Sequence, residues 1–267
     1  MNRGTTQTDA ERRLLTEIAR LAAEAELGNH NHAYPADRPN QKMMIIVAVI
    51  VAVILAVTVA AFLTDKPGIA IIALLCLPVA SPVAFQLRHS VRLLRYRGSR
   101  LDLYEHGLVV AHAGRVQAVR YASTTALRRQ IYPGHNGQAG PIRYEMTDIF
   151  GHSVKVSDVY SNTAHWRVEI DRGLIAAQLP AALATIHSGG RVVFGDIWLS
   201  ATEIGDRKRS APWSQVTPMT VAMGTMAIGT HGKLRDLVGA ETSRIPNFPV
   251  FGALVEQLRS TAQPPNQ

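Results

Sequence analysis

Two long apolar stretches dominate the hydrophobic pattern of the chain. The first runs from Met43 to Leu63 and the second from Gly68 to Leu87, and neither contains Asp, Glu, Lys or Arg. A helix of about 20 residues rises roughly 30 Å, which is the thickness of the hydrocarbon layer of a bilayer. The pattern therefore predicts a transmembrane hairpin over residues 43–87, with spans at 43–63 and 68–87. A buried helical hairpin in a soluble protein is the alternative.

The polar residues before this hairpin predict a helix followed by a linker. Thr8 and Glu11 have the spacing of a capping box, and apolar residues recur at helical intervals from Leu14 onward. Residues 29–41 contain two prolines and lack apolar periodicity, so we expect a linker there. Residues 1–42 are thus interpreted as a cytoplasmic N-terminal helix and linker.

After residue 100 the pattern changes to short apolar stretches separated by Gly, Pro and Asn, which indicate strands and turns. A mainly β segment extends to Val159, and apolar residues then recur at helical spacing between Ile170 and Ala181, where Pro180 is expected to break or kink the helix. A second helical pattern begins near Pro246. Strands followed by one helix predict a small β roll or barrel that the helix closes.

This order of landmarks occurs twice, which predicts a tandem repeat. Three residues of the first copy are echoed about 90 residues later, in the pairs Tyr104 and Phe194, Gly114 and Gly205, and Tyr121 and Trp213. We expect the first repeat at residues 101–188 and the second at 189–260. Residues 261–267 are expected to form a disordered tail.

Charge adds an orientation to this picture. The formal net charge is +8, and residues 1–87 contain equal numbers of basic and acidic residues, so the excess follows the second apolar stretch. Basic residues close to a span are retained on the cytoplasmic side. We therefore expect a multi-pass protein of the plasma membrane with both termini in the cytoplasm. The basic juxtamembrane segment, residues 88–100, contains Arg88, Arg92, Arg95, Arg97 and Arg100.

Basic side chains are also the candidate binding residues, because Arg and Lys recognise phosphate groups. The five juxtamembrane arginines are joined by basic residues on expected hairpins: Arg128, Arg129, Arg207, Lys208 and Arg209. A solvated surface is the alternative. The expected partners are the lipid bilayer, anionic lipid head groups, and a protein partner or second copy of the chain. The mixed charge of the tail disfavours nucleic acid.

No signature of catalysis is found in the sequence. P-loop, zinc-protease, nucleophile-elbow and dinucleotide-binding motifs are absent, and the single cysteine, Cys76, excludes an intramolecular disulfide. His30 and His32 are interpreted as polar linker residues, since two histidines leave a metal site incomplete. We expect no catalytic residue, metal or cofactor, and predict a non-enzymatic binding or scaffold protein. The alternative is a small-molecule sensor or enzyme with a pocket between the two repeats.

Three segments resemble an uncharacterised family of bacterial, largely actinobacterial, membrane proteins that carry a domain of unknown function. They are Leu103–Val110, Val193–Asp196 with Trp213–Val216, and Ile245–Phe251. The resemblance covers roughly residues 97–260 and implies a pleckstrin-homology-like fold for each repeat, without supplying a functional residue. The predicted fold class is thus α+β: an N-terminal amphipathic helix, a two-helix transmembrane hairpin, and tandem pleckstrin-homology-like units, each closed by a C-terminal helix.

Overall fold

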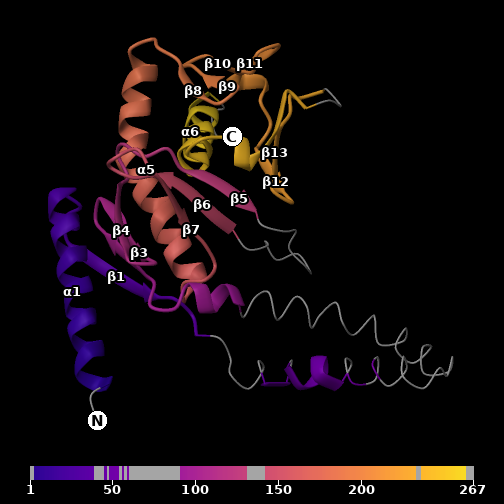
Figure 1. The fold of residues 1–267 in the computed structure, drawn as a ribbon. Coiled ribbons are helices and arrows are strands. Elements are labelled where there is room, and N and C mark those ends of the chain that lie inside the picture. Colours follow the sequence, from indigo (N-terminus) through magenta and orange to yellow (C-terminus); the bar gives the residue numbers. More distant parts are fainter. Residues whose placement is uncertain are drawn as a thin grey trace. The chain divides into compact units, whose positions relative to one another are not determined.

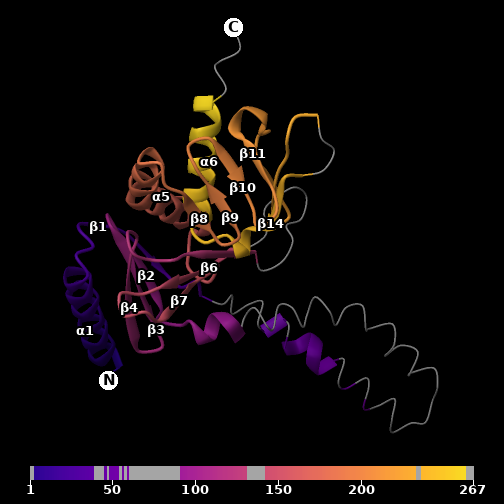
Figure 2. The same ribbon diagram turned by 90° about the horizontal axis from the view of Figure 1, so that it is seen from above.

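The computed structural model describes residues 3–38, 45, 46, 48–53, 56, 59, 91–130, 142–232 and 236–262. The chain forms two compact units, one of residues 1–34 and 100–267 and one of residues 35–99. The larger unit is a mixed α/β structure with several antiparallel sheets (Figure 1, Figure 2).

The larger unit opens with a helix, a four-stranded sheet, a three-stranded sheet and a second helix. These elements are α1 (Arg3–Glu24), β1 (His30–Pro35), β2 (Arg100–Tyr104), β3 (Gly107–His112), β4 (Arg115–Arg120), β5 (Leu127–Gln130), β6 (Ile142–Thr147), β7 (Ser153–Val156) and α5 (Thr163–His187). The four-stranded sheet has the order β1-β2-β3-β4, and the three-stranded sheet the order β5-β6-β7. We call the part from β1 to α5 the first repeat.

The remainder of the larger unit has the same order of elements. They are β8 (Val192–Phe194), β9 (Ile197–Leu199), β10 (Glu203–Gly205), β11 (Ser210–Pro212), η1 (Trp213–Gln215), β12 (Thr220–Ala222), β13 (Thr225–Ile228), β14 (Val238–Glu241), η2 (Thr242–Arg244) and α6 (Phe248–Ala262). Strands β8 to β11 form one sheet and β12 to β14 another. The part from β8 to α6 is the second repeat.

The first repeat begins one strand earlier than the sequence indicated. Tyr121 and Trp213 each follow the fourth strand of a four-stranded sheet, but Tyr104 ends a second strand whereas Phe194 ends a first strand. The segment interpreted as a linker contains β1, the outermost strand of its sheet. The strand lacks an apolar alternation, because five of its six residues are exposed and Tyr34 alone is buried.

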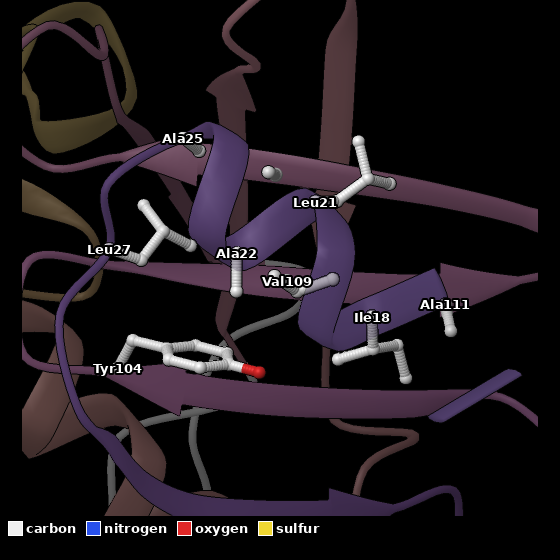
Figure 3. Close-up of a cluster of buried hydrophobic side chains, with 9 residues drawn as sticks. Ile18, Leu21, Ala22, Ala25, Leu27, Tyr104, Val109 and Ala111 are labelled. Carbon is white, nitrogen blue, oxygen red and sulfur yellow. The ribbon is translucent and has the colours of Figure 1, made fainter. Parts of the chain in front are cut away.

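Helix α1 packs on the four-stranded sheet of the first repeat (Figure 3). Ile18, Leu21 and Ala22 lie on one face of the helix, and Ala25, directly after its last residue, continues their spacing. They join Leu27 and the sheet residues Tyr104, Val109, Ala111 and Ala118 in one buried cluster. The predicted amphipathic helix is therefore confirmed, and the first sheet is its partner.

Two helices hold the repeats together. Helix α5 packs against α6 (Figure 1), and Asn247, just before α6, forms hydrogen bonds with α5 and with the segment before β5. Its Nδ2 donates a 2.7 Å hydrogen bond to Gln178 Oε1 of α5, and its Oδ1 accepts a 2.7 Å bond from Ala126 N. The two repeats are thus parts of one packed unit.

The predicted transmembrane hairpin is not borne out. Within the part of the chain that the structure describes, no helix is both long enough and apolar enough to span a bilayer. Of the two long helices, α1 with 22 residues contains charged residues along its length, and α5 with 25 residues contains four between Arg167 and Arg172. This finding contradicts the transmembrane fold class and the multi-pass plasma-membrane location with both termini in the cytoplasm.

Much of the two apolar stretches falls outside the described residues. Of the first stretch, residues 45, 46, 48–53, 56 and 59 are described and have helical backbone, whereas the second, 68–87, is outside. The predicted spans at 43–63 and 68–87 thus lie largely outside the described residues.

Candidate functional site

The arginines of the basic juxtamembrane segment are divided between the two compact units. Arg88 lies outside the described residues. Arg92 and Arg95 lie in a helical stretch, residues 91–95, and Arg97 lies in the turn that follows, all in the smaller unit. Arg100 is the first residue of β2 and belongs to the larger unit.

Arg100 is engaged by a buried carboxylate. Its Nε and Nη2 donate hydrogen bonds of 2.7 and 2.8 Å to the two oxygens of Asp102, whose side chain is 1% exposed. His30 Nε2 lies 2.8 Å from Asp102 Oδ1. The hydrogen bond with Asp102 is the main cause that raises the pKa of Arg100. The bidentate pair lies within β2, whereas the contact of His30 with Asp102 links β1 to β2.

The basic residues on β5 lie beside the contact between the repeats. Arg128 Nη1 is 3.7 Å from Asp171 Oδ2, and its guanidinium carbon lies 5.8 Å from the centre of the Phe248 ring. Tyr144 Oη donates a 2.6 Å hydrogen bond to Asp171, while burial raises the pKa of that carboxyl group. Arg129 lies opposite Arg143 in the pairing of β5 with β6, and the side chain of Arg129 is outside the described part of the chain.

The third basic group lies in the turn between β10 and β11. Arg207 forms a 2.6 Å ion pair with Asp196, and Arg209 Nη1 donates a 2.9 Å hydrogen bond to the carbonyl oxygen of Asp236. Lys208 is exposed. Within the larger unit, Arg100, Arg128 and the turn of Arg207 to Arg209 each contact different groups. Phosphate binding by any of the ten predicted residues stays a prediction.

A cavity of about 210 Å³ lies elsewhere, between the β1–β2 edge of the first sheet and α5. We call it, with the exposed face of β1 beside it, the β1–α5 groove. Its lining residues are Asn31, His32, Leu103, Tyr104, Glu105, Tyr121, Glu169, Arg172, Gly173 and Ala176. Pockets for drug-sized ligands usually measure about 300–1,000 Å³, so this cavity has the scale of a side chain.

Strand β1 and helix α5 are tied together at one end of the groove. Tyr34 Oη is 2.6 Å from His165 Nδ1, and the rings of His32 and His165 meet edge to face with centroids 5.0 Å apart. Tyr34 is the one buried residue of β1. The sheet order leaves one edge of β1 without a neighbouring strand among the described residues. Such an edge can pair with another extended chain.

Carboxylate groups line both walls of the cavity. Glu105 lies in the turn after β2, and Glu169 lies on α5, where its Oε1 is 2.9 Å from Arg172 Nη1. Burial raises the pKa of Tyr34, and so, secondarily, does the negative charge of Glu169. The pKa of Tyr121 is raised as well, again first by burial and then by the charge of Glu169. The negative charge of Glu169 therefore influences the two tyrosines beside the groove.

Sequence reasoning missed this groove. His30, His32 and Tyr34 alternate with the period of a strand, which was a usable signal, but the two prolines nearby favoured a linker. The two acidic residues of α5 have different partners: Glu169 pairs with Arg172, whereas Asp171 accepts a hydrogen bond from Tyr144. Among the described residues no group of three or more His, Cys, Asp or Glu side chains is arranged to hold a metal ion.

The comparisons with known proteins place the chain in a family. The model of a family of unknown function, DUF6585, matches residues 11–264. No curated protein matches the chain. The match runs from α1 to α6 and thus includes both repeats and the β1–α5 groove. The chain therefore belongs to DUF6585, a family of unknown function.

Proposed function

We propose that this protein is a non-enzymatic binding module that holds an extended peptide segment of a partner protein in the β1–α5 groove. The observation that carries the proposal is an exposed edge strand lying beside a cavity of side-chain size. A peptide can add to a sheet edge through its main chain and place a side chain in a neighbouring pocket. Both elements of that mode of recognition are present here.

The size of the cavity favours a peptide over a free small molecule. At about 210 Å³ it would enclose only part of a drug-sized ligand. The edge of β1 extends the contact surface along the strand, and five of its six residues are exposed. Main-chain hydrogen bonds would then supply affinity that the cavity alone does not.

The repeated order of four strands, three strands and a helix supports a second part of the proposal. We take both repeats to be pleckstrin-homology-like units, as the resemblance implies, with the first repeat carrying the peptide groove. The second repeat packs on α5 through α6 and so supports the back of the groove wall.

The test uses the full chain and a library of random 12-residue peptides displayed on phage. Enriched peptides are synthesised, and their affinity is measured by fluorescence anisotropy. Ala176 is exposed and lines the groove, so Ala176→Leu fills the cavity at little cost to the helix. Ala184→Leu is the matched control, since Ala184 is an exposed alanine of the same helix that does not line the cavity.

We expect Ala176→Leu to weaken peptide binding by about tenfold or more, because each lost pocket contact raises the dissociation constant steeply. Ala184→Leu should bind as the unchanged protein does. The proposal is overturned if no peptide is enriched, or if the two variants bind equally well. Enrichment of a peptide matching a segment of this chain would identify a second copy as the partner.

A further inference from the structure

We infer that the cavity of the β1–α5 groove selects a basic side chain, Lys or Arg, from the bound peptide. This inference rests on the proposed function and names the chemistry of its partner. It follows from the two carboxylates, Glu105 and Glu169, which line the cavity from the sheet side and from the helix side.

The walls between these carboxylates suit the stem of a long basic side chain. Leu103, Gly173 and Ala176 contribute apolar surface to the cavity. Lys and Arg bury their methylene groups against such surface while the charged end reaches a polar partner. Gly173 is essential to this space, since a Cβ there would already lie 2.3 Å from a ring carbon of Tyr121.

The groups that face the two carboxylates leave room for a second cation. Glu169 is paired with Arg172, whose side chain is 72% exposed, and an ion pair so accessible to water contributes little stability. Glu105 Oε2 accepts a 3.3 Å hydrogen bond from the neutral amide of Asn29. A basic side chain of the peptide can therefore replace Arg172 at Glu169 or share that carboxylate with it.

The opposite charge would be rejected. A carboxylate or phosphate entering the cavity would meet a like charge on each wall, while Arg172, the one Arg or Lys among the described lining residues, is already paired with Glu169. Burial is the main cause that raises the pKa of both Tyr34 and Tyr121, and the charge of Glu169 adds to it. The groove thus discriminates by sign of charge as well as by size.

The test compares enriched peptides with analogues in which each Arg is replaced by citrulline or each Lys by norleucine. Citrulline keeps the shape of Arg but carries no charge. The variants are Glu105→Gln, Glu169→Gln and both together. Glu256→Gln is the control, because Glu256 is an exposed residue of α6 that, like Glu169, pairs with an arginine three residues further along its helix. Affinities are measured at low and at physiological salt.

We expect the neutral analogue to bind about tenfold more weakly than the basic peptide, and the double Gln variant to lose the same factor for the basic peptide alone. Glu256→Gln should change neither affinity. Peptides without Lys or Arg, or equal binding of basic and neutral peptides, overturn the inference. If the inference is overturned but Ala176→Leu still weakens peptide binding, the proposed function stands. If Ala176→Leu does not weaken binding either, the inference and the proposed function both fail.

Discussion

Gly173 of α5 lies directly against the ring of Tyr121, the residue that follows β4. A Cβ built on Gly173 would be 2.3 Å from Tyr121 Cε2 and 2.6 Å from Cδ2, closer than any real carbon contact. Tyr121 is 2% exposed, so its ring is held by the residues packed around it. The missing side chain therefore sets the separation between α5 and the first sheet, and with it the width of the β1–α5 groove.

Replacing Gly173 by Ala should destabilise the protein. Forcing one methyl group into a closely packed contact costs about 1–3 kcal/mol in free energy of unfolding, measured by urea denaturation. Gly239→Ala is the control, since a Cβ there meets nothing within 4 Å, and it should change stability by less than about 0.5 kcal/mol. Equal stability of the two variants would refute the contact.

The hydrogen bond between Asn247 and Gln178 should couple the two repeats energetically. Asn247 has a φ of 50°, so Asn247→Gly keeps the backbone conformation while removing the side chain. Gln178 Nε2 also donates to the carbonyl oxygens of Tyr121 and Thr124, at 2.6 and 3.0 Å. In a double-mutant cycle with Gln178→Ala, we expect a coupling of about 1 kcal/mol in the free energy of unfolding. Strict additivity would show that this contact does not link the repeats.

Helix α1 should contribute to stability through its buried face. Ile18→Ala removes a side chain that is 3% exposed and should lower the free energy of unfolding by about 3 kcal/mol. Leu15→Ala, at a position 39% exposed on the same helix, should cost less than about 0.5 kcal/mol. Chemical denaturation of both variants decides the point, and similar losses would argue against docking of this face on the sheet.

Asp148 should make stability depend on pH in the acid range. Burial alone would raise its pKa, but hydrogen bonds from His152 N, Gln117 Nε2 and Phe150 N outweigh it and lower the pKa below the ordinary 3.8. A group with a depressed folded-state pKa stabilises the fold above its unfolded-state pKa, and this contribution disappears as the pH falls through the folded-state value.

The matching experiment compares Asp148→Asn with the unchanged protein from pH 7 to pH 2. Asn can still accept from Phe150 N and His152 N, but it carries no charge and its amide nitrogen cannot accept from Gln117 Nε2, so the variant should be less stable by about 1 kcal/mol at pH 7. The difference should shrink below pH 3.8. A difference that stays constant with pH would show that the charge of Asp148 contributes nothing.

Helical periodicity was the most reliable signal in this sequence. The apolar positions of α1 and α6 recur at helical intervals, and both helices are present. Helix α5 begins at Thr163, earlier than its apolar pattern indicated, and continues through Pro180 instead of breaking there. Pro180 is exposed, while buried Leu174 and Ile186 hold the helix on either side of it. Packing thus outweighed the local cost of the proline.

The groove could not be derived from sequence alone, because its residues come from distant segments. Asn31, Glu105, Tyr121 and Glu169 belong to different elements, and only the pairing of β1 with β2 and the packing of α5 bring them together. Basic residues were easier to notice than this mixed lining. Charge counts, however, do not show which arginines already bind carboxylates of the same chain, as Arg100 binds Asp102.

The most direct test of the peptide groove is backbone hydrogen–deuterium exchange of the full chain with and without an enriched peptide. Pairing of the peptide with β1 predicts slower exchange of amides in residues 30–34 in the complex, and no such protection when Ala176→Leu is used. Protection confined to other surfaces, for example β12, with exchange in β1 unchanged, would contradict the account.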